Sequence, residues 1–280
     1  MPFTTTVITG ATSGIGKETA LTLAQKDHAV YLLVRDVVKG EQVKQEIISA
    51  SKNKNIYVIN CDLADLQSVR NAADTLRASL MAINVLINNA GGIFNSYQET
   101  KDGHEMTFQV NHLGHFLLVQ SLLPLLERGQ ARIINISSDA HRIGKPRMQD
   151  INWKKREYSS VGAYAMAKLF NIYFTRSLEV KYGTKGVSAF AVHPGTVNTG
   201  FGNQLTGFYK NLLSLIRPFM QTVEQGAKTP VYLATANRVD AHSGKYFKNK
   251  HITGPASIAT DEPARNKLWE LSMEMVEPYL

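Results

Sequence analysis

Short apolar segments rich in β-branched residues alternate along this chain with longer helical stretches. The strand candidates are Thr4–Thr9, Ala29–Val34, Ile56–Asn60, Val85–Asn88, Arg132–Ile136, Val187–Val192 and Gly244–Phe247. The helix candidates are Ile15–Gln25, Glu41–Ala50, Leu66–Leu80, Gly103–Leu126, Ala163–Tyr182 and, within a C-terminal segment 261–280, Asp261–Pro278. Short, nearly continuous apolar runs suit strands buried on both faces of a parallel sheet. The alternation therefore predicts an α/β fold with one doubly wound, mostly parallel, seven-stranded sheet and helices on both faces.

Composition is that of an ordinary globular protein. The 280 residues are 44% hydrophobic and 19% charged, and no repeat or linker-like stretch divides them, so residues 1–280 are predicted to form a single domain. The single cysteine, Cys61, excludes an internal disulfide and indicates a reducing, cytoplasmic location. The segment Met1–Val7 does not resemble a signal peptide, and no apolar run approaches the roughly 18–20 residues of a spanning helix, so no spanning membrane segment is expected.

The net charge of +8 raises the possibility of an anionic partner such as nucleic acid, a membrane surface or a phosphorylated cofactor. The basic residues are scattered, however, and the local clusters Lys52–Lys54, Lys154–Arg156 and Lys248–Lys250 are short. Solvated surface clusters are the simpler interpretation, and no nucleic-acid motif is present. No nucleic-acid partner is expected.

A glycine-rich segment, Thr9–Gly16, follows the first strand and opens the first helix. Glycines there allow a tight turn, and they let backbone N–H groups approach a pyrophosphate at the positive end of the helix. The spacing is Gly-x3-Gly-x-Gly rather than Gly-x-Gly-x2-Gly, and Thr19 stands where the last glycine of the latter would fall. An ordinary tight turn is the alternative interpretation. The predicted phosphate contacts are Gly10, Thr12, Ser13, Gly14, Ile15 and Gly16.

Tyr164 and Lys168 lie four residues apart in a predicted helix, which places both side chains on one face. A tyrosine hydroxyl with its ordinary pKa of about 10 is a poor proton donor or base near neutrality. A neighbouring ammonium favours the phenolate and lowers that pKa. The segments Tyr97–Lys101 and Tyr246–Lys250 have the same spacing, so the pattern alone does not separate a catalytic pair from a packed tyrosine with a solvated lysine.

Several motifs in register resemble those of the short-chain dehydrogenase/reductase family, from about Thr4 to Phe247. They are Thr9–Gly16, Asn88–Gly91, Asn111, Ile136–Ser138, Tyr164 with Lys168, and His193–Gly195. The segments Cys61–Leu63, Val110–Phe116 and Ala140–His141 look like the retinol dehydrogenase-like branch, many members of which carry an N-terminal membrane anchor that is not expected here. The resemblance implies a Rossmann fold and an oxidoreductase that interconverts an alcohol and a carbonyl. Context within it disfavours Tyr97, in a loop, and Tyr246, on the last strand.

The resemblance also implies roles for four residues. Tyr164 would be the general acid and base, and Lys168 would lower its pKa and bind the nicotinamide ribose. Ser138 would orient the substrate oxygen, and Asn111 would support the proton relay. The gap from Ser138 to Tyr164 is longer than the family's usual gap, and the excess, residues 142–160, is predicted to be an inserted loop beside the site.

The end of the second strand bears on the choice of nicotinamide cofactor. An acidic residue at the strand tip would bind the ribose hydroxyls and repel a 2′-phosphate. Here the tip is Val34, followed by Arg35, whose guanidinium suits a phosphate. NADP(H) is therefore predicted over NAD(H), with Lys39 assisting and Asp36 pointing away. Arg35 as an ordinary surface charge is the alternative.

The remaining cofactor contacts follow from the resemblance. Asp62 would accept from the adenine amino group and Leu63 would supply a backbone N–H. Asn88, Ala90 and Gly91 would flank the adenosine ribose. The nicotinamide or the diphosphate would meet the segment after the sixth strand, through Pro194, Gly195, Thr196, Val197 and Thr199.

Residues 201–223 are apolar and lie where the family has its substrate lid. An apolar lid predicts that the substrate is a lipophilic aldehyde or ketone. Two alternatives are an ordinary helix core and a peripheral membrane contact with Lys210 and Arg217 at its rim.

His112 and His115 have a spacing compatible with metal binding, but no third ligand is near in sequence, so no metal is predicted and both are interpreted as polar or interface residues. The helices Gly103–Leu126 and Ala163–Tyr182 pair across subunits in many relatives, which makes a homo-oligomer an option. The competing function is a catalytically silent nucleotide-binding regulator. A sugar-nucleotide epimerase is disfavoured because no substantial substrate domain follows Phe247.

Overall fold

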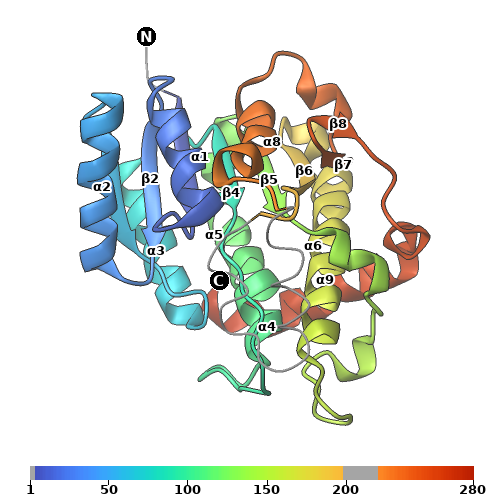
Figure 1. The fold of residues 1–280 in the computed structure, drawn as a ribbon. Helices are drawn as coiled ribbons and strands as arrows, with labels where there is room; N and C mark the ends of the chain where they lie inside the picture. Colours follow the sequence, from blue (N-terminus) through green and yellow to red (C-terminus); the bar gives the residue numbers. More distant parts are fainter. Residues whose placement is uncertain (1–3, 198–219) are drawn as a thin grey trace.

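A single eight-stranded sheet with strand order β3-β2-β1-β4-β5-β6-β7-β8 forms the centre of the protein (Figure 1). The structure is a computed structural model, and it describes residues 4–197 and 220–280. The strands are β1 (Thr5–Thr9), β2 (Ala29–Val34), β3 (Ile56–Asn60), β4 (Val85–Asn88), β5 (Arg132–Ile136), β6 (Ser188–His193), β7 (Tyr246–Lys248) and β8 (His251–Ile252). All neighbours are parallel except β7 and β8. The predicted doubly wound, mostly parallel sheet is confirmed.

The predicted strand number, seven, is wrong by one. Strand β8 returns from β7 through the two-residue loop Asn249-Lys250, and both loop residues have positive φ angles of 50° and 66°. Positive φ at both central residues is the geometry of a tight hairpin turn. Because β8 has only two residues and both are exposed, its sequence carries no apolar alternation that would have revealed it.

Helices cover both faces of the sheet (Figure 1). They are α1 (Gly14–Ala24), α2 (Val37–Ser51), α3 (Leu66–Ser79), α4 (Met106–Phe108), α5 (Gly114–Arg128), α6 (Ser160–Tyr182), α8 (Val223–Thr235) and α9 (Glu262–Val276). The structure therefore divides the predicted helix Gly103–Leu126 into a loop, the short α4, a π-helical turn (Gln109–Leu113) and α5.

Helix α8 was not predicted. Thr222 and Gln225 form a capping box at its start, in which each side chain bonds the backbone N–H of the other residue. A Thr-x-x-Gln pattern is a recognised helix-start signal, so the sequence held a clue to this helix. Pro230 in its middle obscured the pattern, because proline disfavours a helix interior. Of the predicted lid 201–223, residues 201–219 lie outside the described part of the chain.

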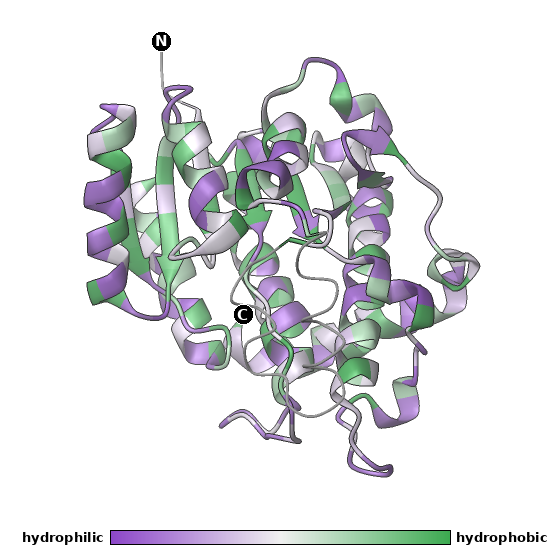
Figure 2. Ribbon diagram, in the orientation of Figure 1, coloured by the Kyte–Doolittle hydropathy of each residue, from purple (hydrophilic) through white to green (hydrophobic). Residues whose placement is uncertain are grey.

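Alternating residues of strands β1 to β7 point into two hydrophobic cores. Val7 and Leu33 point toward α3, α5, α6 and α9, whereas their neighbours Ile8 and Leu32 point toward α1, α2 and α8. Figure 2 shows the same pattern, with hydrophobic strands inside and hydrophilic outer faces on helices such as α2. The sheet thus supplies a rigid frame for the loops at the carboxyl ends of its strands.

Helix α9 covers α5 and α6. The Trp269 ring packs against Phe116, with ring centroids 4.9 Å apart, and against Phe174, at 6.2 Å. The Ser272 hydroxyl is 3.0 Å from Nε2 of His112, a buried residue of the π-helical turn. The C-terminal helix predicted for Asp261–Pro278 is confirmed by α9, and it buries side chains of the two helices that were considered for subunit pairing.

Candidate active site

The loop between β1 and α1 has the geometry of a phosphate cradle. Gly10 and Gly14 adopt φ angles of +68° and +53°, which favour glycine. The Ser13 side chain does not cap α1, and no acidic residue stands in the first turn, so the first amides of the helix are open to an anion. A Cβ atom on Gly16 would lie 2.4 Å from both the Gly10 carbonyl oxygen and Nδ2 of Asn89. The cradle fits the pyrophosphate of a dinucleotide.

Asn89 and Thr9 hold this loop in place, although neither was predicted to have a role of its own. Nδ2 of Asn89 donates to the carbonyl oxygens of Thr9 (2.9 Å) and Gly10 (3.2 Å). The backbone N–H groups of Asn89 and Ala90 both donate to Oγ1 of Thr9, at 3.0 Å. Asn89 stands between Asn88 and Ala90, inside a motif that had been recognised, so the signal was present.

Thr9 also connects the phosphate loop to Asn111 through His115. Oγ1 of Thr9 is 2.8 Å from Nε2 of His115, and Nδ1 of His115 is 3.3 Å from the Asn111 carbonyl oxygen. Because Oγ1 already accepts two amide protons, its own proton is directed to Nε2, and Nδ1–H then donates to Asn111. Burial lowers the pKa of His115 to about 3, so the ring is neutral. His115 is a structural link between Thr9 and the residue Asn111.

Asn111 lies in the π-helical turn Gln109–Leu113, a local geometry that is common at functional sites. Nδ2 of Asn111 donates to the carbonyl oxygens of Gly92 (2.9 Å) and Thr107 (2.8 Å), and Oδ1 accepts from the Gly92 N–H at 3.3 Å. These three bonds fix the buried side chain completely.

Ser138, Tyr164 and Lys168 come together beside Asn111. The Ser138 side chain hydrogen-bonds the Tyr164 hydroxyl, and the Lys168 Nζ lies 5.3 Å from the centre of the Tyr164 ring. A Cβ atom on Gly91 would lie 2.4 Å from Oδ1 of Asn111 and 3.2 Å from the Lys168 Nζ. The four residues expected from the sequence therefore form one cluster, and Gly91 leaves the space between two of them.

The protonation of this cluster is governed by burial. Burial raises the pKa of Tyr164, and the hydrogen bond from Ser138 opposes that rise only in part. Burial also lowers the pKa of Lys168 to about 7, while its Nζ donates to the Ile136 carbonyl oxygen at 3.1 Å. In the protein alone the tyrosine pKa thus moves in the direction opposite to the one expected from a neighbouring ammonium.

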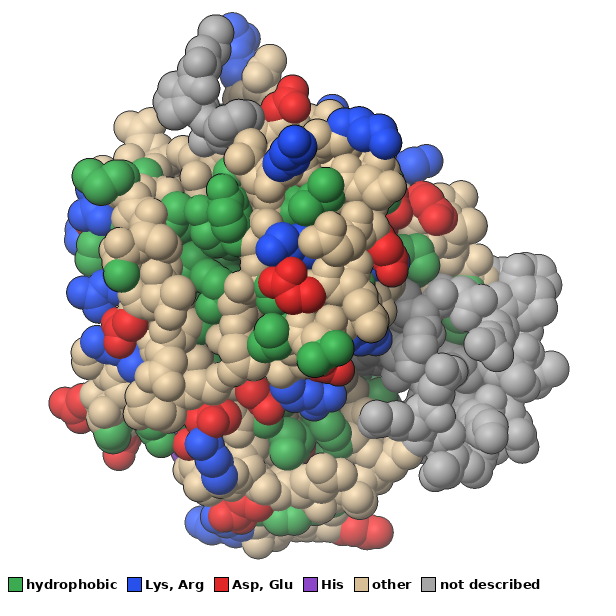
Figure 3. All heavy atoms as spheres, turned by 90° about the vertical axis from the view of Figure 1, so that its left-hand side faces the viewer, with side chains coloured by type: hydrophobic (Ala, Val, Ile, Leu, Met, Phe, Trp, Pro, Cys, Tyr) green, Lys and Arg blue, Asp and Glu red, His purple; other side chains and the backbone are tan. Residues whose placement is uncertain are grey.

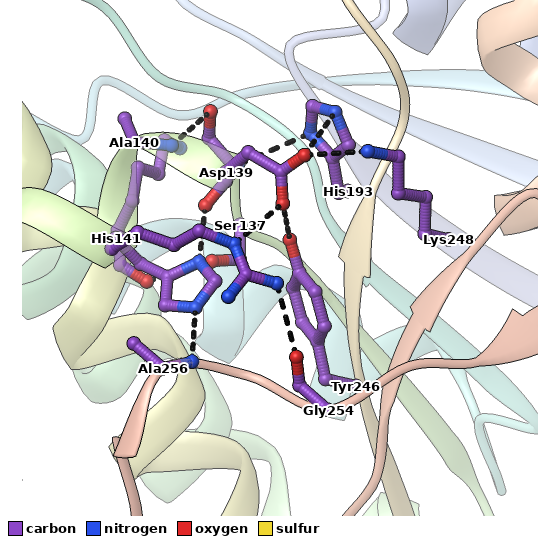
Figure 4. A network of polar contacts seen from close by, with 12 residues as sticks. Ser137, Asp139, Ala140, His141, His193, Tyr246, Lys248, Gly254 and Ala256 are labelled. Atoms are coloured by element: carbon purple, nitrogen blue, oxygen red, sulfur yellow. Dashed lines mark hydrogen bonds and ion pairs between the residues drawn. The ribbon is translucent and has the colours of Figure 1, made fainter. Parts of the chain in front are cut away.

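The two competing tyrosines are engaged elsewhere. The Tyr97 hydroxyl donates to Oε2 of Glu99 at 2.9 Å, and Lys101 forms an ion pair with Asp65. The Tyr246 hydroxyl donates to Oδ1 of Asp139 at 3.0 Å (Figure 4). Neither repeats the Tyr164–Lys168 arrangement.

The inserted segment 142–160 packs against the region that carries Asn111. The Tyr158 hydroxyl contacts Oε1 of Glu105 (3.1 Å), Oγ1 of Thr107 (3.0 Å) and the Phe94 carbonyl oxygen (3.2 Å). The next residue, Ser159, caps α6 by accepting from the Gly162 N–H. The segment therefore joins the start of the Tyr164 helix to the turn that presents Asn111.

The predicted 2′-phosphate contacts lie at the surface after β2. Arg35 and Lys39 are exposed, and neither forms an ion pair with another described residue. Asp36 caps α2, accepting from the Lys39 N–H at 3.0 Å, so its carboxylate is directed to the helix. Seen from the α2 side, basic and acidic side chains are interspersed over the part of the face that is described (Figure 3). The two cations are thus available to an anion.

Two of the other predicted contacts have partners within the protein. Oδ1 of Asp62 accepts from the Ala64 N–H at 3.0 Å, which shapes the turn that precedes α3. The buried Asn88 amide donates to Oδ1 of Asn135 at 2.8 Å, so its side chain points along the sheet toward β5. Asp62, by contrast, retains a second carboxylate oxygen for a ligand.

The segment after β6 is fixed by the residues before α8. Gly195 has a φ angle of +95°, and a Cβ atom there would lie 1.9 Å from Oε1 of Gln221. The Gln221 N–H donates to the Thr196 carbonyl oxygen at 2.8 Å, and Val197 packs against Gly226. Pro194 begins this segment, and Thr199 lies outside the described residues.

The described residues lack two features that bear on function. Residues 4–197 and 220–280 contain no group of three or more His, Cys, Asp or Glu side chains that could hold a metal ion. Across the same ranges, no helix combines the length and hydropathy needed to cross a membrane.

The fold and the site define a class of oxidoreductase. A family model described as short chain dehydrogenase matches residues 4–209, and the chain belongs to this family. Within it, the chain is similar to the retinol dehydrogenases, as expected: retinol dehydrogenase 12 of Mus musculus is 41% identical over 283 residues, which cover 99% of this chain and 87% of the relative.

Solved structures agree with the fold. An uncharacterised protein from Mycobacterium paratuberculosis has a TM-score of 0.78 and 32% identity, over 98% of this chain and 93% of that one. An NADPH-bound carbonyl reductase from chicken fatty liver has a TM-score of 0.67 and 25% identity, over 91% of this chain and 100% of that one.

Proposed function

We propose that the protein is an NADP(H)-dependent oxidoreductase that interconverts an alcohol and a carbonyl in a lipophilic substrate. The observation that carries the proposal is the meeting of Asn111, Ser138, Tyr164 and Lys168 in one cluster beside Gly91. Family membership supports oxidoreductase chemistry and a nicotinamide cofactor.

Each side chain has a role that its environment suits. Ser138 and Tyr164 share a hydrogen bond, so one substrate oxygen can be bound by both hydroxyls. Burial keeps Tyr164 protonated at neutral pH, which is the form that donates a proton to a carbonyl oxygen. Lys168, with a pKa near 7, can hold or release a proton next to it and bind the cofactor ribose. The bound nicotinamide supplies or accepts the hydride.

Proton supply to Tyr164 would involve Asn111. Its side chain is fixed by three hydrogen bonds, and its carbonyl oxygen is held by His115. Asn111, fixed in this way beside Lys168, is suited to bind a relay water, because an acceptor that is already immobile loses little entropy when the water binds. The π-helical turn therefore serves to present this group.

The choice of NADP(H) rests on Arg35 and Lys39, which lie exposed after Val34 with no described ion-pair partner. A guanidinium and an ammonium at this edge favour a 2′-phosphate by charge. Replacing Val34 with Asp adds a carboxylate at the buried strand tip and should shift preference toward NAD(H). An unchanged ratio of kcat/KM for the two cofactors would contradict this assignment.

The lipophilic substrate is proposed from the apolar segment 201–223 and from similarity to retinol dehydrogenases. We also propose that the protein is cytoplasmic and can form a homo-oligomer, with residues 201–223 as a candidate peripheral membrane contact. A screen of NADPH oxidation with aliphatic, aromatic, steroid and retinoid carbonyls would identify the substrate class.

Replacing Tyr164 with Phe tests the mechanism. It should remove turnover and leave NADPH binding, followed by its fluorescence, nearly intact. Tyr97→Phe is the matched control, because Tyr97 has the same spacing to a lysine but lies away from the cluster. If the wild-type protein binds NADPH but turns over no carbonyl, the result would instead favour the catalytically silent nucleotide-binding regulator.

A further inference from the structure

Asp139, the residue after Ser138, joins three strands at the carboxyl edge of the sheet (Figure 4). Its Oδ2 is 2.7 Å from the Lys248 Nζ and 3.3 Å from Nε2 of His193, and its Oδ1 accepts from the Tyr246 hydroxyl at 3.0 Å. Asp139 follows β5, His193 ends β6, and Tyr246 and Lys248 belong to β7. One carboxylate thus ties the end of β5 to its neighbour β6 and to β7, the next strand in the sheet.

His193 binds Asp139 at two points, which fixes its tautomer. The Asp139 N–H donates to Nδ1 of His193 at 3.3 Å, so Nδ1 carries no proton. Nε2 then carries the proton and donates it to the Asp139 carboxylate. His193 directly precedes Pro194. This double contact therefore holds the segment Pro194–Val197, which is predicted to contact the cofactor, against the backbone of residue 139.

The charges of the network agree with these bonds. Burial alone would raise the pKa of Asp139, but the Lys248 ammonium, His193 and the Tyr246 hydroxyl outweigh it and lower the pKa. Arg142 adds a cation, with its Nε 3.6 Å from Oδ1. Burial lowers the pKa of His193, so the ring stays neutral beside an ionised carboxylate.

The other side of Ser138 is held as well. Nε2 of His141 accepts from the Ala256 N–H at 3.0 Å, so Nδ1 carries the proton and donates it to the Ser138 carbonyl oxygen at 2.7 Å. The Ser138 Oγ accepts from the Ala140 N–H at 3.2 Å. The backbone of Ser138 is therefore restrained on one side by His141 and on the other by Asp139. Asp139 supplies the contact to His193 and so to the segment Pro194–Val197.

We infer that Asp139 is a positioning residue that sets Ser138, and with it the substrate oxygen, at a fixed place relative to the segment Pro194–Val197. The inference rests on the proposed function of Ser138. Small displacements of a positioned reactant lower rates steeply, so loss of the Asp139 contacts affects turnover more than it affects cofactor binding.

The test compares Asp139→Ala and Asp139→Asn with Asp240→Asn. Asp240 forms an ion pair with Arg132, at the opposite end of the same strand β5, and is the matched control for a purely structural loss. We expect Asp139→Ala to lower kcat by about 10- to 100-fold with NADPH affinity within about twofold of wild type. Asp139→Asn keeps one acceptor oxygen, so its kcat should lie between those of the wild type and Asp139→Ala. Asp240→Asn should keep the wild-type kcat.

A second readout does not depend on turnover. Relaxation of the ¹⁵N amides of Gly195, Thr196 and Val197, measured by NMR in the full-length protein, should report a rigid segment in the wild type and increased motion in Asp139→Ala, because the carboxylate contact to His193 is lost. Wild-type kcat in Asp139→Ala, or equal losses in Asp139→Ala and Asp240→Asn, would overturn the inference. If no carbonyl is turned over, the proposed function fails, and unchanged amide relaxation of Gly195–Val197 in Asp139→Ala then overturns the positioning role independently.

Discussion

Replacing Lys168 with Met should stabilise the protein at neutral and acidic pH while abolishing turnover. Lys168 is 3% exposed, and burial lowers its pKa from 10.5 to about 7. Each pKa unit corresponds to about 1.4 kcal/mol, so the buried ammonium costs roughly 4–5 kcal/mol of folding free energy below pH 7. Met is of similar length and has no charge to bury.

The hydrogen bond lost with the ammonium offsets little of this gain. The Nζ donates to the Ile136 carbonyl oxygen, but the same oxygen also accepts from Nδ2 of Asn171 at 3.0 Å and stays satisfied in the variant. A typical net loss is about 1 kcal/mol. Lys168→Met should therefore raise the free energy of unfolding by about 3–4 kcal/mol at pH 6.

The sign of the pH dependence follows from proton counts. Between pH 7 and pH 10.5 the unfolded lysine holds its proton more than the folded one does, so wild-type stability rises with pH relative to Lys168→Met. The difference is largest below pH 7, and above pH 10.5 only the lost hydrogen bond remains. Urea unfolding at a series of pH values measures it directly, with a midpoint shift of about 1 M expected at pH 6.

Lys181→Met is the control, since Lys181 is exposed on the last turn of the same helix. It should leave the pH dependence as in the wild type. A constant stability difference between wild type and Lys168→Met from pH 6 to pH 10 would refute the argument that burial sets the Lys168 pKa.

Two further substitutions test the packing around the site. Gly91→Ala would place a Cβ atom 2.4 Å from Oδ1 of Asn111, so we expect turnover to fall by about 10- to 100-fold, and a wild-type rate would show that the site adapts. Tyr158→Phe removes a hydroxyl bonded to Glu105, so thermal unfolding should report a loss of about 1–3 kcal/mol; an effect no larger than that of Tyr97→Phe, at an exposed tyrosine, would contradict the role assigned to the insertion.

The sequence was most informative where a local pattern determines the outcome. Strand periodicity predicted β1 to β6 closely, and ordered motifs placed Ser138, Tyr164 and Lys168, whose meeting the structure reproduces. Conversely, β8 has two residues, too few for a pattern, and α8 contains a proline that hides its helical period.

Tertiary contacts were harder to predict. In the link from Thr9 through His115 to Asn111, Thr9 and His115 are 106 positions apart in the sequence, so spacing alone could not reveal the contact. The rise in the Tyr164 pKa that burial causes, and the fall in the Lys168 pKa that burial causes, were not predicted. Such effects depend on the sum of surrounding atoms and not on any motif.

The packing of α9 over α5 and α6 also sets an order of events during synthesis. Trp269 is translated long after Phe116 and Phe174, so the apolar surface that it covers stays open on the ribosome until the last described helix emerges. Exposed apolar surface on a partly folded chain promotes aggregation. A chain terminated before residue 262 would therefore contain every strand of the sheet but would expose the apolar surface that α9 covers. We expect such a chain to aggregate or to bind chaperones.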